Sequence, residues 1–191
     1  MQSNRKSGFT LIELLITIVI LVILATIAFP SFVDTLDRRR VINATSELVT
    51  QIQLARSIAI VRNVQVEMHM QSDEDDNTEW CIGLTDDLNG CDCFTANSCT
   101  VGVPELGNND RFEARILSTG FPGVTLDPEY ISPIRFEPTR GMRSDTSRAT
   151  DASYTFTSNR GIETTTTINI IGRVSTCAPT SDSLLGGINP C

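Results

Sequence analysis

The most apolar stretch of the chain lies near its N-terminus, where residues 9–29 are hydrophobic almost throughout. A helix of this length spans about 30 Å, which is the thickness of the hydrocarbon core of a bilayer. Glu13 is the only charged side chain in this stretch. A carboxylate at membrane depth costs about 3 kcal/mol on insertion scales and usually has a partner or a function. We therefore expect a transmembrane helix over residues 9–29, with Glu13 as a candidate functional residue.

A second helical segment, amphipathic rather than uniformly apolar, is predicted over residues 30–63. Its small and aliphatic residues recur every three or four positions, at Ala44, Leu48, Ile52, Ala55 and Ala59. This spacing places one apolar stripe along a helix, and we expect the stripe to pack on a β-sheet. Because proline supplies no amide hydrogen, we expect Pro30 to bend or loosen the helix where the segment begins.

Beyond residue 63 the hydrophobic period changes to two, which is typical of half-buried strands. The alternation is clearest over residues 64–70, and shorter strands are predicted over residues 80–84, 111–117, 124–126, 154–157 and 164–171. Residues 85–107 show little periodicity, so we expect a loop held by crosslinks instead of apolar burial. The sequence thus predicts an α+β fold, in which residues 64–191 form a β-rich domain with one antiparallel sheet or two small ones.

The charge of the chain is acidic, with a formal net charge of −8. Removal of residues 1–8 would take away Arg5 and Lys6 and no acid, which brings the net charge to −10. An acidic surface argues against a protein that coats nucleic acid by bulk electrostatics, although it permits a local basic patch.

All six cysteines lie beyond residue 80, a number and placement that fit disulfides in an oxidising compartment such as a bacterial periplasm. Cys177 and Cys191 are expected to close a C-terminal loop. Cys91 and Cys93 are separated by one residue, so we expect each to pair with Cys81 or Cys99, in an order that the sequence leaves open. The alternative is a zinc site, for which the only histidine is His69 and the cysteine spacing lacks paired C-x-x-C motifs.

Catalytic and cofactor motifs are missing from the sequence, which has one histidine and no glycine-rich phosphate loop between a strand and a helix. We expect no enzyme activity and no cofactor. A candidate calcium site combines Asp87, Asn89 and Asp92 around a glycine turn, since calcium prefers such oxygen donors. The EF-hand spacing is absent, and the alternative interpretation of these residues is an acidic Asn-Gly turn. The paired acids Asp86 and Asp87 are interpreted as solvated loop charges and not as catalytic groups.

The residues around Gly8 and Phe9 resemble a prepilin peptidase site, because Gly8-Phe9 is followed by Thr10-Leu11-Ile12-Glu13 and the apolar run. Three further stretches are similar to the GspH/FimT/FimU branch of pilin-like proteins: residues 55–63, 136–141 and 172–174. The resemblance implies a pilin fold with a leader peptide over residues 1–8. It also implies cleavage after Gly8, N-methylation of Phe9, and contact between Glu13 and the N-terminal amine of a neighbouring subunit.

The resemblance implies a minor pilin of a type IV pilus, anchored in the bacterial inner membrane with its domain in the periplasm before it enters the filament. Its expected partners are prepilin peptidase, other major and minor pilins, and the pilus assembly machinery. One alternative is a GspH-like pseudopilin of a type II secretion system. Another is a DNA-uptake pilin, for which Arg173 matches the first arginine of the branch's G-R-x-R motif while Ser175 replaces the second. Arg140, Arg143, Arg148 and Arg160 are candidates for a substitute basic patch.

Overall fold

A long helix, α1 (Leu11–Arg62), leads into a β-rich domain. The computed structural model describes residues 9–72, 78–102, 110–128, 133–144, 151–178 and 188–191, apart from the side chains of residues 28, 30 and 31. The helix continues through Pro30 and ends one residue before the predicted boundary. The chain divides into two compact units, Met1–Leu36 and Asp37–Cys191, which are described separately below.

The strands of the second unit follow α1 in the order β1 to β11. Their bounds are β1 Val66–Ser72, β2 Trp80–Thr85, β3 Thr100–Gly102, β4 Arg111–Glu113, β5 Arg115–Leu117, β6 Val124–Pro128, β7 Ile134–Phe136, β8 Ala152–Ser158, β9 Glu163–Ile168, β10 Val174–Ala178 and β11 Asn189–Pro190. A 3-10 turn, η1 (Ser118–Gly120), separates β5 from β6. Each strand segment predicted from alternation overlaps at least one of these strands.

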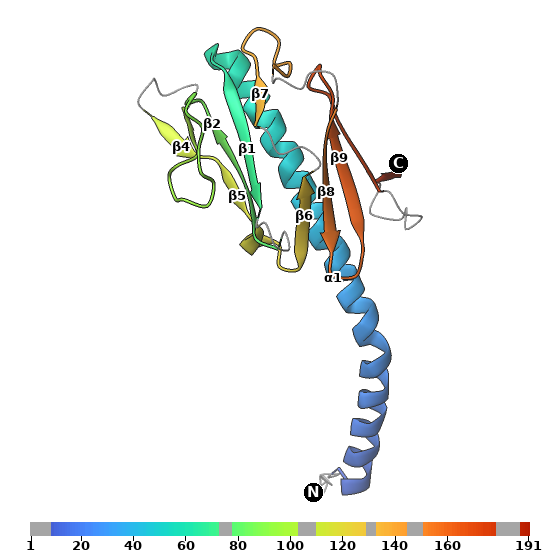
Figure 1. The fold of residues 1–191 in the computed structure, drawn as a ribbon. Helices are drawn as coiled ribbons and strands as arrows, with labels where there is room; N and C mark the ends of the chain where they lie inside the picture. The colour runs from blue at the N-terminus through green and yellow to red at the C-terminus, as the bar shows by residue number, and fades with distance from the viewer. Residues whose placement is uncertain (1–8, 73–77, 103–109, 129–132, 145–150, 179–187) are drawn as a thin grey trace, which may run out of the picture. The chain divides into compact units, whose positions relative to one another are not determined.

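Two main sheets carry the domain (Figure 1). The first has the strand order β5-β2-β1-β7 and the second the order β11-β10-β9-β8-β6, while β3 and β4 form a separate ribbon. All pairs are antiparallel except β10 with β11, which is parallel. The expected α+β fold, with a long helix packed on antiparallel sheets, is therefore confirmed, and the short β10–β11 pair adds one parallel contact at the C-terminal end.

The core of the domain lies between the second half of α1 and the two sheets. Every residue of the predicted helix stripe is at most 1% exposed, which confirms the stripe. Trp80 is fully buried, its ring centroid lies 5.8 Å from that of Phe121 and 5.2 Å from that of Phe156, and its Nε1 donates to the carbonyl of Val124 at 2.8 Å. This tryptophan thus ties β2 of the first sheet to β6 and β8 of the second.

Arg143 forms a second link between the sheets. It bridges Phe136 at the end of β7, and its amide donates to the carbonyl of Ile170 at 3.0 Å. Its guanidinium, which is 1% exposed, donates to the carbonyl of Ile168 at 2.8 Å. The residue is therefore part of the interior, and its proposed place in a basic surface patch was wrong.

Candidate functional site

The N-terminal end of α1 begins with a side-chain cap. The hydroxyl of Thr10 accepts a hydrogen bond from the amide of Glu13 at 3.2 Å, and the Thr10 carbonyl accepts one from Leu14 at 3.2 Å. Thr-x-x-Glu is the sequence of a capping box, which stabilises the first helical turn. Glu13 thus occupies the first turn, where a carboxylate also interacts favourably with the helix dipole. Gly8 lies outside the described residues.

The first half of α1 presents apolar side chains outward. A segment of the helix is long and apolar enough to cross a membrane, judged by length and composition. Phe9 is 83% exposed, and the described side chains between Phe9 and Phe29 are exposed throughout. So much exposed aliphatic surface requires either lipid or neighbouring apolar helices around it.

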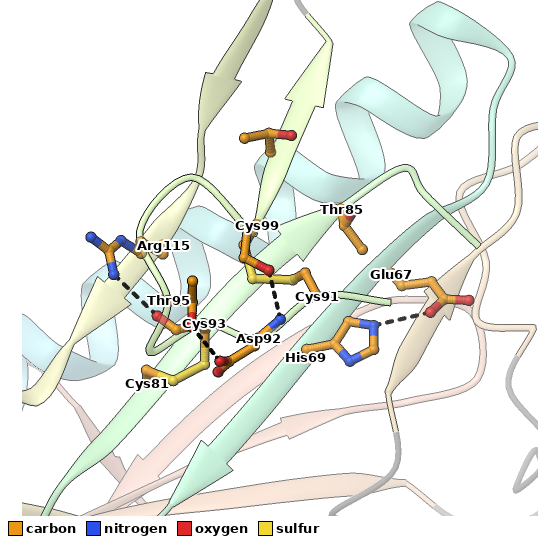
Figure 2. The surroundings of a disulfide bond; sticks show 12 residues. Glu67, His69, Cys81, Thr85, Cys91, Asp92, Cys93, Thr95, Cys99 and Arg115 are labelled. Carbon is orange, nitrogen blue, oxygen red and sulfur yellow. Dashed lines mark hydrogen bonds and ion pairs between the residues drawn. A yellow bond between two sulfur atoms is a disulfide. The ribbon is translucent and has the colours of Figure 1, made fainter. Parts of the chain in front are cut away.

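Three disulfides join the cysteines: Cys81–Cys93, Cys91–Cys99 and Cys177–Cys191. The first two lie close together over the strand β2 (Figure 2). A Cβ added to Gly83 of β2 would collide with Cys99 and Cys93, so the crosslinked loop rests directly on the strand backbone. Because all six sulfurs are bonded to one another, none is a thiolate for zinc.

The crosslinked loop contributes to the core, contrary to the expectation from its sequence. Cys93, Cys99 and Val101 are fully buried, and β3 pairs with β4 at the end of the loop. The side chain of Gln71 fixes the loop from β1, since its Oε1 accepts a hydrogen bond from the amide of Cys93 at 3.0 Å. The loop is therefore held both by its disulfides and by burial.

His69, the only histidine, faces Glu67 along β1 rather than a metal site. Its Nε2 lies 3.0 Å from the carboxylate of Glu67, which also accepts a hydrogen bond from Arg135 Nε at 2.6 Å. A Cβ added at Gly90 would be 2.9 Å from the imidazole, so the turn at Gly90 lies against the ring. Glu67 is almost completely buried, and its side-chain hydrogen bonds with Arg135, His69 and Gln65 offset the cost of burying a carboxyl group.

The two aspartates among the calcium candidates accept hydrogen bonds from their own loop, and Asn89 is a donor. Asp87 Oδ1 accepts from the amide of Asn89 at 3.0 Å and from its side chain at 2.9 Å. Asp92 accepts from the amide of Phe94 at 3.0 Å and from the hydroxyl of Thr95 at 2.6 Å, and these bonds lower the pKa of Asp92. In the part of the chain that the structure describes, no three acidic, histidine or cysteine side chains are grouped as metal ligands.

Asp86 differs from the solvated charge expected for it. Its side chain is 6% exposed and accepts hydrogen bonds from Arg62 at the end of α1, from Arg111 of β4, and from the amide of Gly102 at 3.2 Å. Burial alone raises the pKa of this carboxyl, but the hydrogen bonds from Arg111, Gly102 and Arg62 outweigh it and hold the pKa below 3.8. Asp86 therefore joins α1, β2 and the β3–β4 ribbon.

The arginines proposed as a basic patch do not gather as expected. Arg143 is buried, Arg148 lies outside the described residues, and Arg160 in the β8–β9 turn pairs with Asp37 at 3.4 Å. Arg173 is exposed in the β9–β10 turn, where its amide donates to Asn169 Oδ1 at 2.8 Å. The β9–β10 turn lies at the end of β9 opposite to the β8–β9 turn, so Arg160 and Arg173 are kept apart.

A different set of arginines surrounds Gly172. The Nε of Arg56 on α1 donates to the carbonyl of Gly141 at 2.9 Å. A Cβ at Gly172 would lie 2.8 Å from that carbonyl and 2.9 Å from Arg56 Nε, and the φ of Gly172 is 76°. Glycine is thus required next to Arg173, and the close approach brings the loop of Arg140 beside the turn of Arg173. Sequence reasoning missed this grouping because Arg56 and Gly141 are 85 residues apart.

Comparisons with known proteins identify two families along the chain. Residues 3–29 match the family model of the prokaryotic N-terminal methylation motif, and residues 44–172 match the family model described as type II transport protein GspH. Two curated fimbrial proteins of Pseudomonas aeruginosa are each 37% identical over 83 residues, which is 44% of this chain and 51% of theirs. The chain thus spans about half the length of the curated relatives it matches.

Two crystal structures of the type IV minor pilin FimU of P. aeruginosa are similar to the chain at 17% identity. They cover 75% and 73% of this chain and 96% and 97% of their own, with TM-scores of 0.44 and 0.41.

Proposed function

Since the chain belongs to the GspH family of pilin-like proteins, we propose that it is a minor pilin of a type IV pilus, of the FimU/FimT kind. Proteins of this family are structural subunits and not enzymes. The observation that supports the proposal most is the N-terminal methylation motif over residues 3–29, which coincides with an outward-facing apolar helix. The curated relatives, which are fimbrial proteins, favour a pilus over a secretion apparatus.

The chain in this proposal has four parts. Residues 1–8 are a leader, cut off after Gly8, and Phe9 becomes the methylated N-terminus. Residues 9–29 hold the subunit in the inner membrane and later pack against neighbouring helices in the filament core, where these contacts replace lipid. Residues 30–63 are the amphipathic half of the helix, and residues 64–191 are the domain, which faces the periplasm and then the outside of the filament.

Glu13 in this proposal sets the axial position of the subunit. A carboxylate in the apolar core of a filament needs a cationic partner, and the N-terminal amine of a neighbouring Phe9 is the nearest one that processing supplies. Thr10 supports this role, because its hydroxyl accepts a hydrogen bond from the Glu13 amide and thereby stabilises the helical turn that carries the carboxylate.

Mass spectrometry of sheared filaments tests the proposal. Surface filaments are sheared from cells that make the protein, and the digest is searched for a peptide that starts at methylated Phe9. Its presence in the filament fraction is the expected result. A processed subunit that stays in the inner membrane, while a known minor pilin is detected in the same sheared sample, would refute a role in the pilus.

That negative result would favour the second candidate, a GspH-like pseudopilin of a type II secretion system. The description of the matching family, type II transport protein, supports this candidate. Deletion of the gene would then block secretion of folded exoproteins and leave surface pili intact, whereas a minor pilin shows the opposite pattern.

A DNA-uptake pilin is the third candidate, and it is supported by the exposed Arg173 in its Gly-Arg turn. Binding of duplex DNA to the protein, with a loss of affinity in Arg173→Glu and none in Arg160→Glu, would support it. If the affinity for DNA is the same in the wild type and in Arg173→Glu, the Gly-Arg turn takes no part in DNA binding.

A further inference from the structure

The exposed hydrophobic side chains of the second unit fall into two groups. Among the described residues from Asp37 onward, six large hydrophobic side chains are exposed, namely Ile60, Val61, Leu88, Phe94, Ile170 and Ile171. Four of them lie on α1 and the β9–β10 turn, and the other two lie in the disulfide-bonded loop. The first group lies beside arginines and the second beside aspartates.

The first group forms what we call the apical face, made of Ile60, Val61, Ile170 and Ile171 with Arg140 and Arg173. The end of α1, the loop after β7 and the β9–β10 turn meet at the same end of the domain (Figure 1). Ile60 Cδ1 is 2.9 Å from the position of a Cβ at Gly141, and the Gly141 carbonyl is 2.8 Å from the corresponding position at Gly172. These close approaches show that the three segments touch, so their exposed side chains share one surface.

The charge of the apical face is positive. Arg140 and Arg173 are exposed, and neither forms an ion pair with a carboxylate in the described residues. Arg56 adds a third guanidinium, held against the Gly141 carbonyl. This concentration of positive charge on a chain with a net charge of −8 leaves the apical face complementary to an acidic partner.

The second group forms what we call the acidic loop, residues 87–94. Leu88 is 71% exposed and Phe94 is 46% exposed, and they are accompanied by the exposed carboxylates of Asp87 and Asp92. Within the described residues neither carboxylate is ion-paired. Both disulfides and the hydrogen bonds inside the loop hold it in one conformation, so little conformational entropy would be lost on binding.

We propose that the apical face of one copy of this protein binds the acidic loop of a second copy. Each surface combines exposed aliphatic or aromatic side chains with charges that match those of the other, which is the composition of a protein–protein interface. Because the two surfaces differ, the contact is heterologous and leaves one of each free for further copies. The inference goes beyond the proposed function and does not depend on the membrane-spanning helix.

Charge reversal on the two surfaces tests the proposal. The mature full-length chain in detergent micelles is compared with an apical variant, Arg140→Glu with Arg173→Glu, and a loop variant, Asp87→Arg with Asp92→Arg. Arg39→Glu is the matched control, since Arg39 is an exposed arginine on α1 outside both surfaces. Sedimentation velocity over a range of protein and salt concentrations measures self-association, and the fluorescence of the buried Trp80 checks the fold.

Wild type and control are expected to associate equally, and less strongly as salt increases. Each variant alone places like charges opposite one another and is expected to associate at least roughly tenfold more weakly. An equimolar mixture of the two variants restores opposite charges at every contact, so association is expected to return. Misfolding does not produce such a rescue.

Three results would overturn the proposal. The first is self-association of all variants at the wild-type level, which would assign the association to the apolar helices. The second is a wild type that stays monomeric at all salt concentrations. The third is an apical variant that loses DNA binding while its self-association is unchanged, which would assign the apical face to nucleic acid.

Discussion

Substitution of Asp86 by asparagine tests whether the contacts around this carboxylate stabilise the domain. Asp86 is 6% exposed and accepts hydrogen bonds from Arg62, Arg111 and the amide of Gly102. Asparagine keeps the shape of the side chain and one acceptor oxygen. Its NH2 group, however, is a hydrogen-bond donor and would face the N–H donors of an arginine. A hydrogen bond to a charged group contributes about 1.5–3 kcal/mol, so we expect the Asp86→Asn variant to lose about 2–3 kcal/mol of the free energy of unfolding.

The assay is urea denaturation of the full-length chain in detergent micelles, with the disulfides intact. The chain has a single tryptophan, Trp80, which is buried against Phe121 and Phe156 and therefore reports the unfolding of the domain. With a urea dependence of about 2 kcal/mol per molar, the midpoint is expected to fall by about 1 M at pH 7 with no change in slope. A shift that corresponds to less than about 0.5 kcal/mol would refute the reasoning, because an effect that small is typical of exposed ion pairs.

The pH dependence of the difference in unfolding free energy between wild type and Asp86→Asn provides an independent check. The pKa of Asp86 is lower in the folded protein than its ordinary value of 3.8. The stabilising contribution of the ionised carboxylate is therefore fully present above pH 3.8 and is lost as the pH falls through the folded pKa. The difference in stability between wild type and Asp86→Asn should be constant from neutral pH down to about pH 5 and shrink below 3.8. If the difference in stability disappears near pH 6, a titrating group other than Asp86 is responsible for it.

Three further changes have defined expected outcomes. Glu13→Ala should still be cleaved and methylated but enter filaments poorly, measured by immunoblots of sheared and membrane fractions; normal incorporation would refute its role in axial position. Gly172→Ala should lower the stability of the domain by about 1–3 kcal/mol, because its φ of 76° is left-handed and the new Cβ meets the Gly141 carbonyl, and unchanged urea denaturation would contradict this. Replacing both Cys91 and Cys99 by serine opens a loop with a sequence separation of 8 and should cost about 2.5 kcal/mol by loop entropy; an unshifted Trp80 transition would show that burial alone holds the loop.

Helices and strands with a regular spacing of hydrophobic residues could be predicted, because the face of an element that packs on the core must be apolar. The stripe of α1 and the alternation in β1, β8 and β9 come from one face of each element packing on the core. The short strands β3 and β10 could not be predicted in this way. β3 has three residues, and β10 reads Val-Ser-Thr-Cys-Ala, in which only Ala178 is fully buried.

The charged contacts were harder to foresee because their partners are distant in sequence. Asp86 meets Arg62 and Arg111, which are 24 and 25 residues away, so the local acidic composition suggested a solvated loop instead. Arg143 is buried, and the residues next to it in the sequence give no indication of this burial. The cysteines were different, because close spacing and an even number left few sensible pairings even though the order within the loop stayed open.

The position of Arg143 has a consequence for the cooperativity of the domain. Its amide and guanidinium bind carbonyls of Ile170 and Ile168, while its backbone bridges Phe136 of the other sheet. Opening of the second sheet at β9 would leave a buried guanidinium without its carbonyl acceptor, which is unfavourable by several kcal/mol, and opening of the first sheet at β7 would break the backbone bridge that positions the residue. Partial unfolding of one sheet alone is thereby suppressed, and the amides of β7 and β9 should exchange with solvent at similar rates, as members of one cooperative unit. If the subunit is extracted from a membrane by its helix, as proposed above, a force on the helix would act on a domain whose two sheets unfold together.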